Sequence, residues 1–448
     1  MDFRQFTFSI IFIATFSISA LADEPLGAVQ SESVNQSSNS VSSFDQTMDA
    51  RSVGGIEEVV VTAQKREESL QDTPIALTAI TESTIEDLDI QNVVDMAGIS
   101  PNVMLVETPS NNTSATIAMR GGVTINPAIT WEPTVGVYLD GVYLGKTQGA
   151  IFDVVDLERV EILRGPQGTL YGRNTLGGAI NLISKKPSGS GTEFKSTIGD
   201  YGLRQFQLIS DVKLGENTFG KVVMNKKDRG GYVKNFVSPF GPPQGVVPTA
   251  APTLNDLDTI DAEGYRVNLS WNSDVSSLDF AIDYNRQNNT PPFAQLGNTI
   301  PNWSAAFGVG ASALTGGLKL WPIELFTSKD REKVAHINEN TFEISKVEGT
   351  SLTYSRDLSF GTVKAIIAKR ETTWSDNLDL DGGPFPIANT SRFTTYESDT
   401  VELQLTGQRN NLNYVLGYYS LKDEAYTSNP QSFFGGGQVF AQNYSGDG

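Results

Sequence analysis

The chain has 448 residues, a formal net charge of −19, no cysteine and a single histidine, His336. The absence of cysteine excludes a disulfide scaffold and any thiolate-based site. The acidic balance argues against a nucleic-acid partner, because phosphate binding needs a basic surface. One isolated histidine offers neither a metal centre nor a catalytic triad, so we expect no catalytic residues, no metal site and no cofactor.

A short apolar run, residues 10–21, follows Arg4 and ends in Ala20-Leu21-Ala22. Small residues at these spacings are typical of a secretory cleavage site, so residues 1–22 are predicted to be a signal peptide. A buried core strand is the alternative interpretation. No other run approaches the roughly 18 apolar residues of a transmembrane helix.

Residues 23–56 are rich in Ser, Gln and Asn without periodicity, which predicts a flexible linker. A β-prone run, residues 57–63, follows abruptly. An extended peptide behind a tether suits addition as a strand to another protein's sheet. The first strand of the next domain explains the run equally well. The residues expected to pair with a partner are Glu57, Glu58, Val59, Val60, Val61 and Thr62.

Residues 64–187 predict an α+β domain. A helix is expected from Thr81 or Ser83 to Leu88, and a shorter one over 92–97 that stops at Gly98. Two polar loops are expected at 108–114 and 122–133. The predicted strands are 74–81, 102–107, 115–119, 135–139, 158–163 and 179–184.

From residue 190 apolar and polar residues alternate strictly, as where Val401, Leu403 and Leu405 flank Glu402 and Gln404. Short links after the even-numbered strands and long ones after the third, fifth and seventh are typical of a transmembrane β-barrel, with 288–348 the longest connection. A soluble sandwich also alternates but gives no reason for this parity. The expected strands are 192–199, 202–213, 218–229, 262–273, 276–287, 349–359, 361–374, 396–407 and 411–424. Aromatic residues near their ends are expected to form interfacial girdles: Trp271, Tyr284, Trp374, Tyr396 and Tyr418.

Residues 158–172 read ERVEILRGPQGTLYG and continue as RNTLGGAINLI, which resembles the plug-domain signature of TonB-dependent outer-membrane receptors. Residues 117–121 resemble another plug motif, and residues 57–63 resemble the TonB box. The resemblance implies a plug domain, residues 64–187, followed by an antiparallel transmembrane β-barrel, residues 188–448. Family barrels that hold a plug have about 22 strands, of which nine are expected here.

The resemblance also implies a function: TonB-dependent import of a scarce solute, in most members a ferric siderophore. The implied partners are TonB with its inner-membrane energising complex, outer-membrane lipid and a metal chelate, with the plug and TonB box facing the periplasm. Import of a carbohydrate or cobalamin is the alternative. Haem is disfavoured because haem receptors generally use histidines. A signalling receptor would need a folded domain before the TonB box, and residues 23–56 are too short and polar.

Two sets of site residues follow from this resemblance. Ligand contacts are expected in the plug loops, at Asn111, Asn112, Asn126 and Trp131. Plug–barrel contacts are expected from Arg120, Arg164 and Arg173, with Glu402 as an inward-facing counter-ion, because a stranded buried charge is costly. The alternative is that these arginines face water in the lumen.

Nine strands are too few to close a barrel around such a plug, and an open sheet edge in lipid is costly. The sequence therefore predicts either a fragment of a longer receptor or a truncated, non-functional one.

Overall fold

The computed structural model describes residues 59–108, 111–124, 131–146, 156–235, 256–295, 297, 328–335, 337, 341–383, 388–410, 412–433 and 438–447. The predicted signal peptide, the linker, Glu57, Glu58, Asn126 and His336 lie outside these ranges. Within them, no helix is long and apolar enough to cross a membrane.

The first domain is built on a five-stranded mixed sheet in which only β7 and β10 run parallel. A three-stranded antiparallel sheet and a two-stranded one accompany it. The five-stranded order is β3 (Leu77–Thr81), β9 (Leu157–Arg164), β10 (Gly178–Ser184), β7 (Val135–Leu139) and β8 (Val142–Tyr143). The smaller sheets are β4 (Val103–Glu107), β5 (Ala115–Met119) and β6 (Gly122–Val123), and β1 (Val60–Val61) with β2 (Glu68–Ser69).

Three short helices complete this domain: α1 (Glu82–Asp87), the 3₁₀ helix η1 (Val94–Met96) and α2 (Gly168–Tyr171). Thr81 is the N-cap residue of α1 and Leu88 its C-cap, as the sequence predicts. Asn92 lies two residues before the next helix, and its side-chain oxygen accepts the N–H of Val94, the first helical residue, at 2.7 Å. The predicted strands and helices of this domain are thereby confirmed, whereas β2, β6, β8 and α2 are additional.

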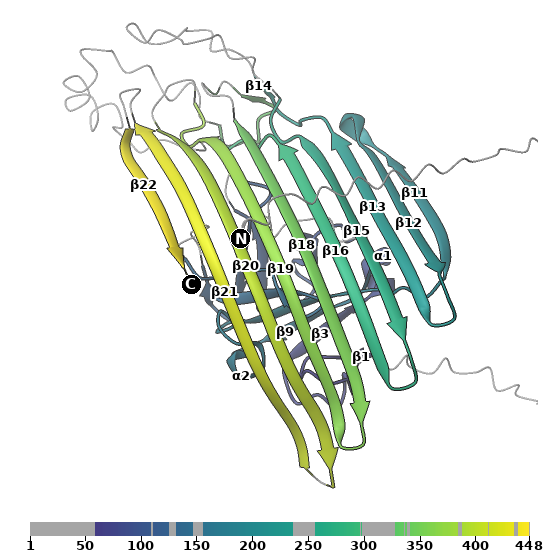
Figure 1. Cartoon of the computed structure of the whole chain (residues 1–448). Helices are drawn as coiled ribbons and strands as arrows, with labels where there is room; N and C mark the ends of the chain where they lie inside the picture. Colours follow the sequence, from purple (N-terminus) through teal and green to yellow (C-terminus); the bar gives the residue numbers. More distant parts are fainter. Residues whose placement is uncertain are drawn as a thin grey trace, which may run out of the picture. The chain divides into compact units, whose positions relative to one another are not determined.

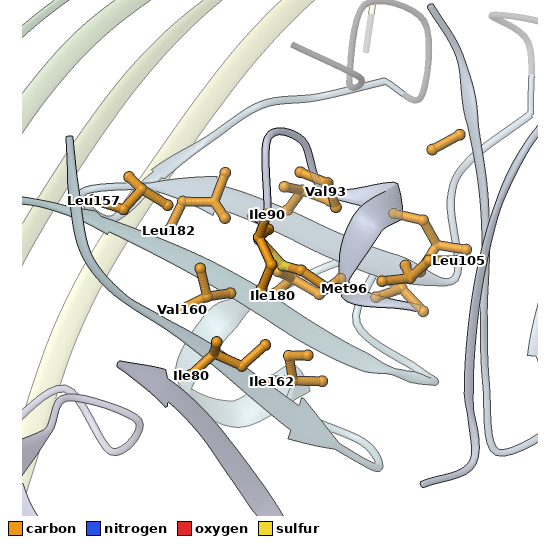
Figure 2. Close-up of a cluster of buried hydrophobic side chains, with 14 of the residues drawn as sticks. Ile80, Ile90, Val93, Met96, Leu105, Leu157, Val160, Ile162, Ile180 and Leu182 are labelled. Atoms are coloured by element: carbon orange, nitrogen blue, oxygen red, sulfur yellow. The ribbon is translucent and has the colours of Figure 1, made fainter. Parts of the chain in front are cut away.

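The core of this domain lies between the five-stranded sheet and the segments around η1, and Figure 2 shows its central side chains. Val160, Ile162, Ile180 and Leu182 have no exposed surface, and Met96 packs against the same cluster. Fully burying an apolar side chain of this size stabilises a fold by roughly 1.5–3 kcal/mol. The apolar spacing in β9 and β10 is therefore what holds the domain together.

The second part is one antiparallel sheet of ten described strands, and Figure 1 shows them side by side in chain order. Every neighbouring pair in this sheet is antiparallel, as the alternating pattern predicts. The strands are β11 (Gly191–Ile198), β12 (Arg204–Lys213), β13 (Thr218–Arg229), β15 (Ile260–Asn272), β16 (Ser276–Asn289), β18 (Phe342–Leu358), β19 (Gly361–Asp379), β20 (Ala388–Arg409), β21 (Leu412–Phe433) and β22 (Gln438–Asp447).

Two expectations about this sheet are wrong. No strand was expected beyond residue 424, but residues 438–447 form β22, because β21 offers them an edge to pair with. The long loop expected between the seventh and eighth strands shortens to 380–387, because β19 and β20 continue pairing beyond it. Ser391 donates to Asn377 Oδ1 at 2.7 Å across this extension. In this extension, cross-strand pairs of hydroxyl and amide side chains take the place of apolar ones, so the alternating pattern used to predict strands is absent there.

A smaller assembly lies between the two long connections, which leave the sheet after β13 and β16. There β14 (Lys234–Asn235) pairs in parallel with β17 (Val334–Ala335). A small apolar cluster of Val233, Leu257, Ala335 and Ile337 accompanies the pair.

The two faces of the ten-stranded sheet differ as alternation requires. On β20, Val401 and Leu403 are 37% and 48% exposed, whereas Thr400 and Glu402 are 2% and 7% exposed. The first pair lies on the outward face and the second on the face that contacts the first domain. Trp374 and Tyr396, expected in an interfacial girdle, are buried on that inner face, so this expectation is wrong for both.

Candidate functional site: the contacts between the first domain and the sheet

The inner face of the sheet contacts the first domain at three rows of residues. The lower row lies nearest the short turn between β18 and β19, the upper row nearest the long connections, and the middle row between them. Cross-strand register aligns Asp279, Thr353, Ile366 and Glu402 in the lower row; Arg266, Asp283, Gly349, Arg370, Ser398 and Asp423 in the middle row; and Asn289, Glu343, Asp376 and Arg392 in the upper row.

In the lower row Glu402 is held by Lys65, whose ammonium lies 3.1 Å from the carboxylate. Both side chains are about nine-tenths buried, at 11% and 9% exposure. Gln404 also donates to Glu402 at 2.6 Å, and the Lys65 ammonium lies 4.7 Å from the centre of the Tyr171 ring. Glu402 is therefore a counter-ion to the first domain, but its partner is a lysine and not one of the three expected arginines.

In the middle row Asp283 accepts two hydrogen bonds from Arg370, at 2.9 and 3.2 Å. These residues lie on β16 and β19, and Gly349 of β18 lies between them. A Cβ at position 349 would overlap the Arg370 guanidinium and would come within 2.7 Å of the Asp283 carboxylate. The pair therefore needs glycine at this position.

Both ends of the middle row bind the first domain. Arg266 donates to Asp140, and Arg173 lies 2.7 Å from Asp423. The Tyr396 hydroxyl also donates to Asp423, at 3.1 Å. The positive charges of the row thus alternate with its negative ones, and the first domain supplies one charge of each sign.

The other two expected arginines make their described contacts within the first domain. The Arg120 guanidinium lies against Gly165, and Arg164 donates to the Pro101 carbonyl at 3.3 Å. Trp131 is 56% exposed on the same domain.

The upper row holds the loop that contains Asn111 and Asn112. The Glu343 carboxylate accepts the N–H groups of Asn112 and Thr113 at 2.8 and 3.0 Å and also the Thr113 hydroxyl. Trp374 donates its indole N–H to that hydroxyl at 2.9 Å. Asn111 has no exposed surface, and its side-chain oxygen accepts the Ser114 N–H at 2.8 Å. Asn112 and Thr113 therefore attach the loop to the inner face of the sheet, whereas Asn111 holds the turn of the loop itself.

The predicted partner-binding run folds onto the first domain. β1 pairs with β2 over only two residue pairs, with Val60 43% exposed and Val61 fully buried. The Thr62 N–H donates to Glu161 at 2.7 Å. Glu161 has no exposed surface and also accepts from Arg159 at 2.9 Å. In this structure the run forms the first strand of the domain. Its ladder with β2 is so short that few main-chain hydrogen bonds would have to break for the two strands to separate.

The first domain is also anchored where it enters the sheet. Lys221 of β13 lies 3.1 Å from Asp156 and 3.8 Å from Asp211. Asp211 accepts the N–H groups of Ser188 and Gly189 at 3.0 and 2.8 Å. Burial raises the pKa of Asp156, and Lys221 opposes that rise by favouring the carboxylate. This anchor lies beside the covalent link between the first domain and the sheet, whereas the three rows lie away from that link.

Sequence reasoning missed the main partners on the sheet, Glu343 and Asp423, and their counterparts in the first domain, among them Lys65 and Asp140. Inward parity of a charged residue was the signal available for Asp423, as it was for Glu402. Glu343 lay outside every predicted strand, so no parity could be assigned to it.

Residues 69–179 match the family model described as TonB-dependent Receptor Plug Domain. The chain carries the plug domain of a TonB-dependent receptor. The plug and the sheet beside it also share their fold with solved siderophore receptors. The ferric yersiniabactin uptake receptor FyuA from Yersinia pestis superimposes with a TM-score of 0.62 at 15% identity, over 84% of this chain and 60% of that one. The ferripyoverdine receptor of the outer membrane of Pseudomonas aeruginosa gives 0.61 at 14% identity, over 84% and 46%.

Relatives in sequence include receptors of two ligand classes. The catecholate siderophore receptor Fiu of Escherichia coli (strain K12) is 33% identical over 162 residues, which cover 35% of this chain and 20% of Fiu. The vitamin B12 transporter BtuB of Vibrio vulnificus is 22% identical over 248 residues, covering 54% and 39%. The chain thus spans well under two thirds of the relatives it matches.

Proposed function

We propose that this chain belongs to a receptor that imports a ferric siderophore across the outer membrane with energy supplied through TonB. The observation that carries the proposal is the plug-domain match of residues 69–179. Fiu, FyuA and the ferripyoverdine receptor are each named for a siderophore or its ferric complex, which favours that solute class. In this arrangement the outward face of the sheet contacts lipid, and β1 faces the periplasm.

The contacts of the plug suit a part that is held firmly and released reversibly. Lys65–Glu402 and Arg173–Asp423 are discrete ion pairs between the plug and the inner face of the sheet, here called the wall. Each partner keeps other polar neighbours: Gln404 for Glu402, and Tyr396 for Asp423. Because those neighbours can satisfy the wall carboxylates, separating the plug from the wall costs less than stranding a bare charge.

TonB would engage the run from Val59 to Thr62 by strand addition. The edge of β1 is half-exposed at Val60, and its pairing with β2 extends over only two residues. A competing strand can replace so short a ladder, because main-chain hydrogen bonds supply the affinity in this mode of recognition. Traction on this run would act first on Thr62–Glu161 and then on Lys65–Glu402.

The test is uptake of radioactive iron, presented as a ferric siderophore, by cells that have this receptor as their only ferric receptor. We expect accumulation in cells with TonB and surface binding without accumulation in cells that lack it. Equal accumulation in both strains would contradict the proposal.

Cobalamin is the second candidate, because the match to BtuB covers more of the chain than the match to Fiu. The same strain pair separates the two: labelled cobalamin replaces labelled iron, and the compound that accumulates only with TonB is the substrate.

A further inference from the structure

Glu161 is a fully buried carboxylate in the middle of the main sheet of the plug. It lies on β9, with Ala79 of β3 opposite it on one side and Asn181 of β10 on the other. By alternation it shares a face of β9 with Leu163, which packs in an apolar cluster that includes Ala63. A well-packed apolar side chain of similar volume often stabilises such a site at least as well as a buried ion pair does. Stability of the sheet alone therefore does not account for the carboxylate.

The donors to Glu161 come from three residues in the described part of the chain. Thr62 donates its N–H at 2.7 Å and its hydroxyl at 3.1 Å, Arg159 its Nε–H at 2.9 Å, and Asn181 its side-chain amide at 3.3 Å. Arg159 and Asn181 lie in the sheet, whereas Thr62 belongs to the run from Val59 to Thr62. The run therefore supplies two of the bonds to this carboxylate, and one of them is the shortest.

The donors within the sheet are fixed by other contacts of the plug. Arg159 also binds Glu158 on its own strand. The Asn181 amide donates to the Tyr171 hydroxyl at 2.7 Å as well as to Glu161. Because these partners belong to the folded sheet and to α2, the Glu161 carboxylate cannot follow Thr62 when the run leaves the plug.

The other polar attachments of the run are neutral main-chain bonds. β1 pairs with β2 over two residue pairs, and the Val59 carbonyl accepts the Leu70 N–H at 2.9 Å. Hydrogen bonds to an ionised acceptor are roughly twice as strong as neutral ones. Thr62–Glu161 is therefore the strongest polar contact among those that hold the run.

Loss of Thr62 would leave a buried charge with fewer donors, which is costly. That cost opposes separation of the run from the plug. We propose that Glu161 is a positioning residue for energy coupling, whose charge holds Thr62, and with it the run from Val59 to Thr62, on the plug. This inference rests on the proposed function in that TonB engages this run, and it names the side chain against which TonB has to act.

The experiment measures the rate at which a water-soluble maleimide labels Val61→Cys in the complete receptor in isolated outer membranes. Val61 is fully buried in the run, and the chain has no native cysteine. We expect Glu161→Leu to raise the labelling rate at least about tenfold, because an apolar side chain accepts nothing from Thr62. Glu161→Gln keeps an acceptor oxygen without the charge and should raise the rate by a smaller factor. An unchanged rate in Glu161→Leu would overturn the proposal.

Two controls separate positioning of the run from stability of the plug. Glu158→Gln removes the other carboxylate that binds Arg159, is 48% exposed, and should leave labelling of Val61→Cys unchanged. Leu182→Cys lies fully buried on the opposite face of the sheet and should stay unlabelled when combined with Glu161→Leu. Equal acceleration at positions 61 and 182 would mean that Glu161 only stabilises the plug, and this result would also overturn the proposal.

Thr62→Val tests whether the two residues act through one contact. It removes the hydroxyl and keeps the N–H, so it should accelerate labelling of Val61→Cys less than Glu161→Leu does. Combined with Glu161→Leu it should add nothing, whereas independent effects that multiply would contradict a shared contact. Labelling needs no TonB, so failure of this experiment is distinct from failure of TonB-dependent accumulation.

Discussion

Asp283 and Arg370 bind each other across a strand that lies between them, with two hydrogen bonds passing over Gly349. The glycine is the condition for the pair, because any Cβ there would overlap both charged groups. Their side chains are 20% and 7% exposed, so the pair lies largely out of water. The pair joins Arg266 to the centre of the middle row, since Arg266 lies 3.5 Å from the same aspartate.

Gly349→Val is the first test. Overpacking alone costs about 1–3 kcal/mol, and separating a buried ion pair costs about 3–5 kcal/mol more. We expect a large fall in the heat resistance of the folded receptor in semi-native electrophoresis. Gly417→Ala is the matched control, because its nearest neighbour, the Leu403 carbonyl oxygen, is at an ordinary 3.6 Å. Equal heat resistance of the two variants would contradict the role of Gly349.

Lys65–Glu402 gives the second prediction, which concerns retention of the plug. Removing one partner leaves the other charge buried, so Lys65→Met and Glu402→Gln should each loosen the plug. We expect each single variant to raise leakage of a bulky antibiotic through the outer membrane, and the double variant to leak less than the sum of both. The outward pair Lys422–Glu424, 68% and 59% exposed, is the control and should change nothing measurable. Additive effects at Lys65 and Glu402 would show that the two groups act separately.

The sequence could predict only those features of the contacts that follow from the alternation of residues along a strand. Alternation fixes the face of a residue, and it assigns Glu402, which is 7% exposed, to the inner face. Its partner depends on how the plug is placed, and Lys65 lies 337 residues away in sequence. Arg173 was expected on the wall, but nothing local to it points to Asp423.

Residue type gave the wrong location for two aromatic residues, whereas their position in the alternating pattern gives the right one. Trp374 and Tyr396 were assigned to a girdle because aromatic residues favour interfaces, yet they share parity with Arg370 and Glu402 on their own strands. Both face the plug, where Trp374 binds Thr113 and Tyr396 binds Asp423. An aromatic residue indicates an interface, but only the alternation along the strand shows whether that interface is with lipid or with the plug.

Thr113 gives the third prediction, because its hydroxyl serves two wall residues at once. It donates to Glu343 and accepts from Trp374. Thr113→Val preserves shape but leaves a buried carboxylate and an indole N–H short of a partner, at about 1–3 kcal/mol each. We expect faster proteolysis of the plug loop in the variant. Thr113→Ser keeps the hydroxyl and should protect the loop like the original residue; equal cleavage of both variants would contradict the argument.

Trp131 is the best single residue at which to test ligand contact on the plug. Its side chain is 56% exposed, and aromatic groups offer large rigid contact area at low entropic cost. We expect Trp131→Ala to weaken ligand binding several-fold without lowering the amount of folded receptor. Leu176→Ala removes another exposed apolar group, at 72% exposure, and serves as the control. Unchanged affinity in Trp131→Ala would favour a packing role for the indole.

Val60 tests coupling to TonB. Strand addition depends on main-chain donors, and proline removes the N–H while fixing φ. We expect Val60→Pro to abolish accumulation of the solute and to leave surface binding intact, because the ligand contacts lie elsewhere. Val60→Ala keeps the N–H and should retain most uptake. The comparison of the two variants also distinguishes side-chain from backbone recognition. Loss of uptake in both would mean that TonB recognises the valine side chain. Normal uptake by Val60→Pro would show that this run is only the first strand of the plug.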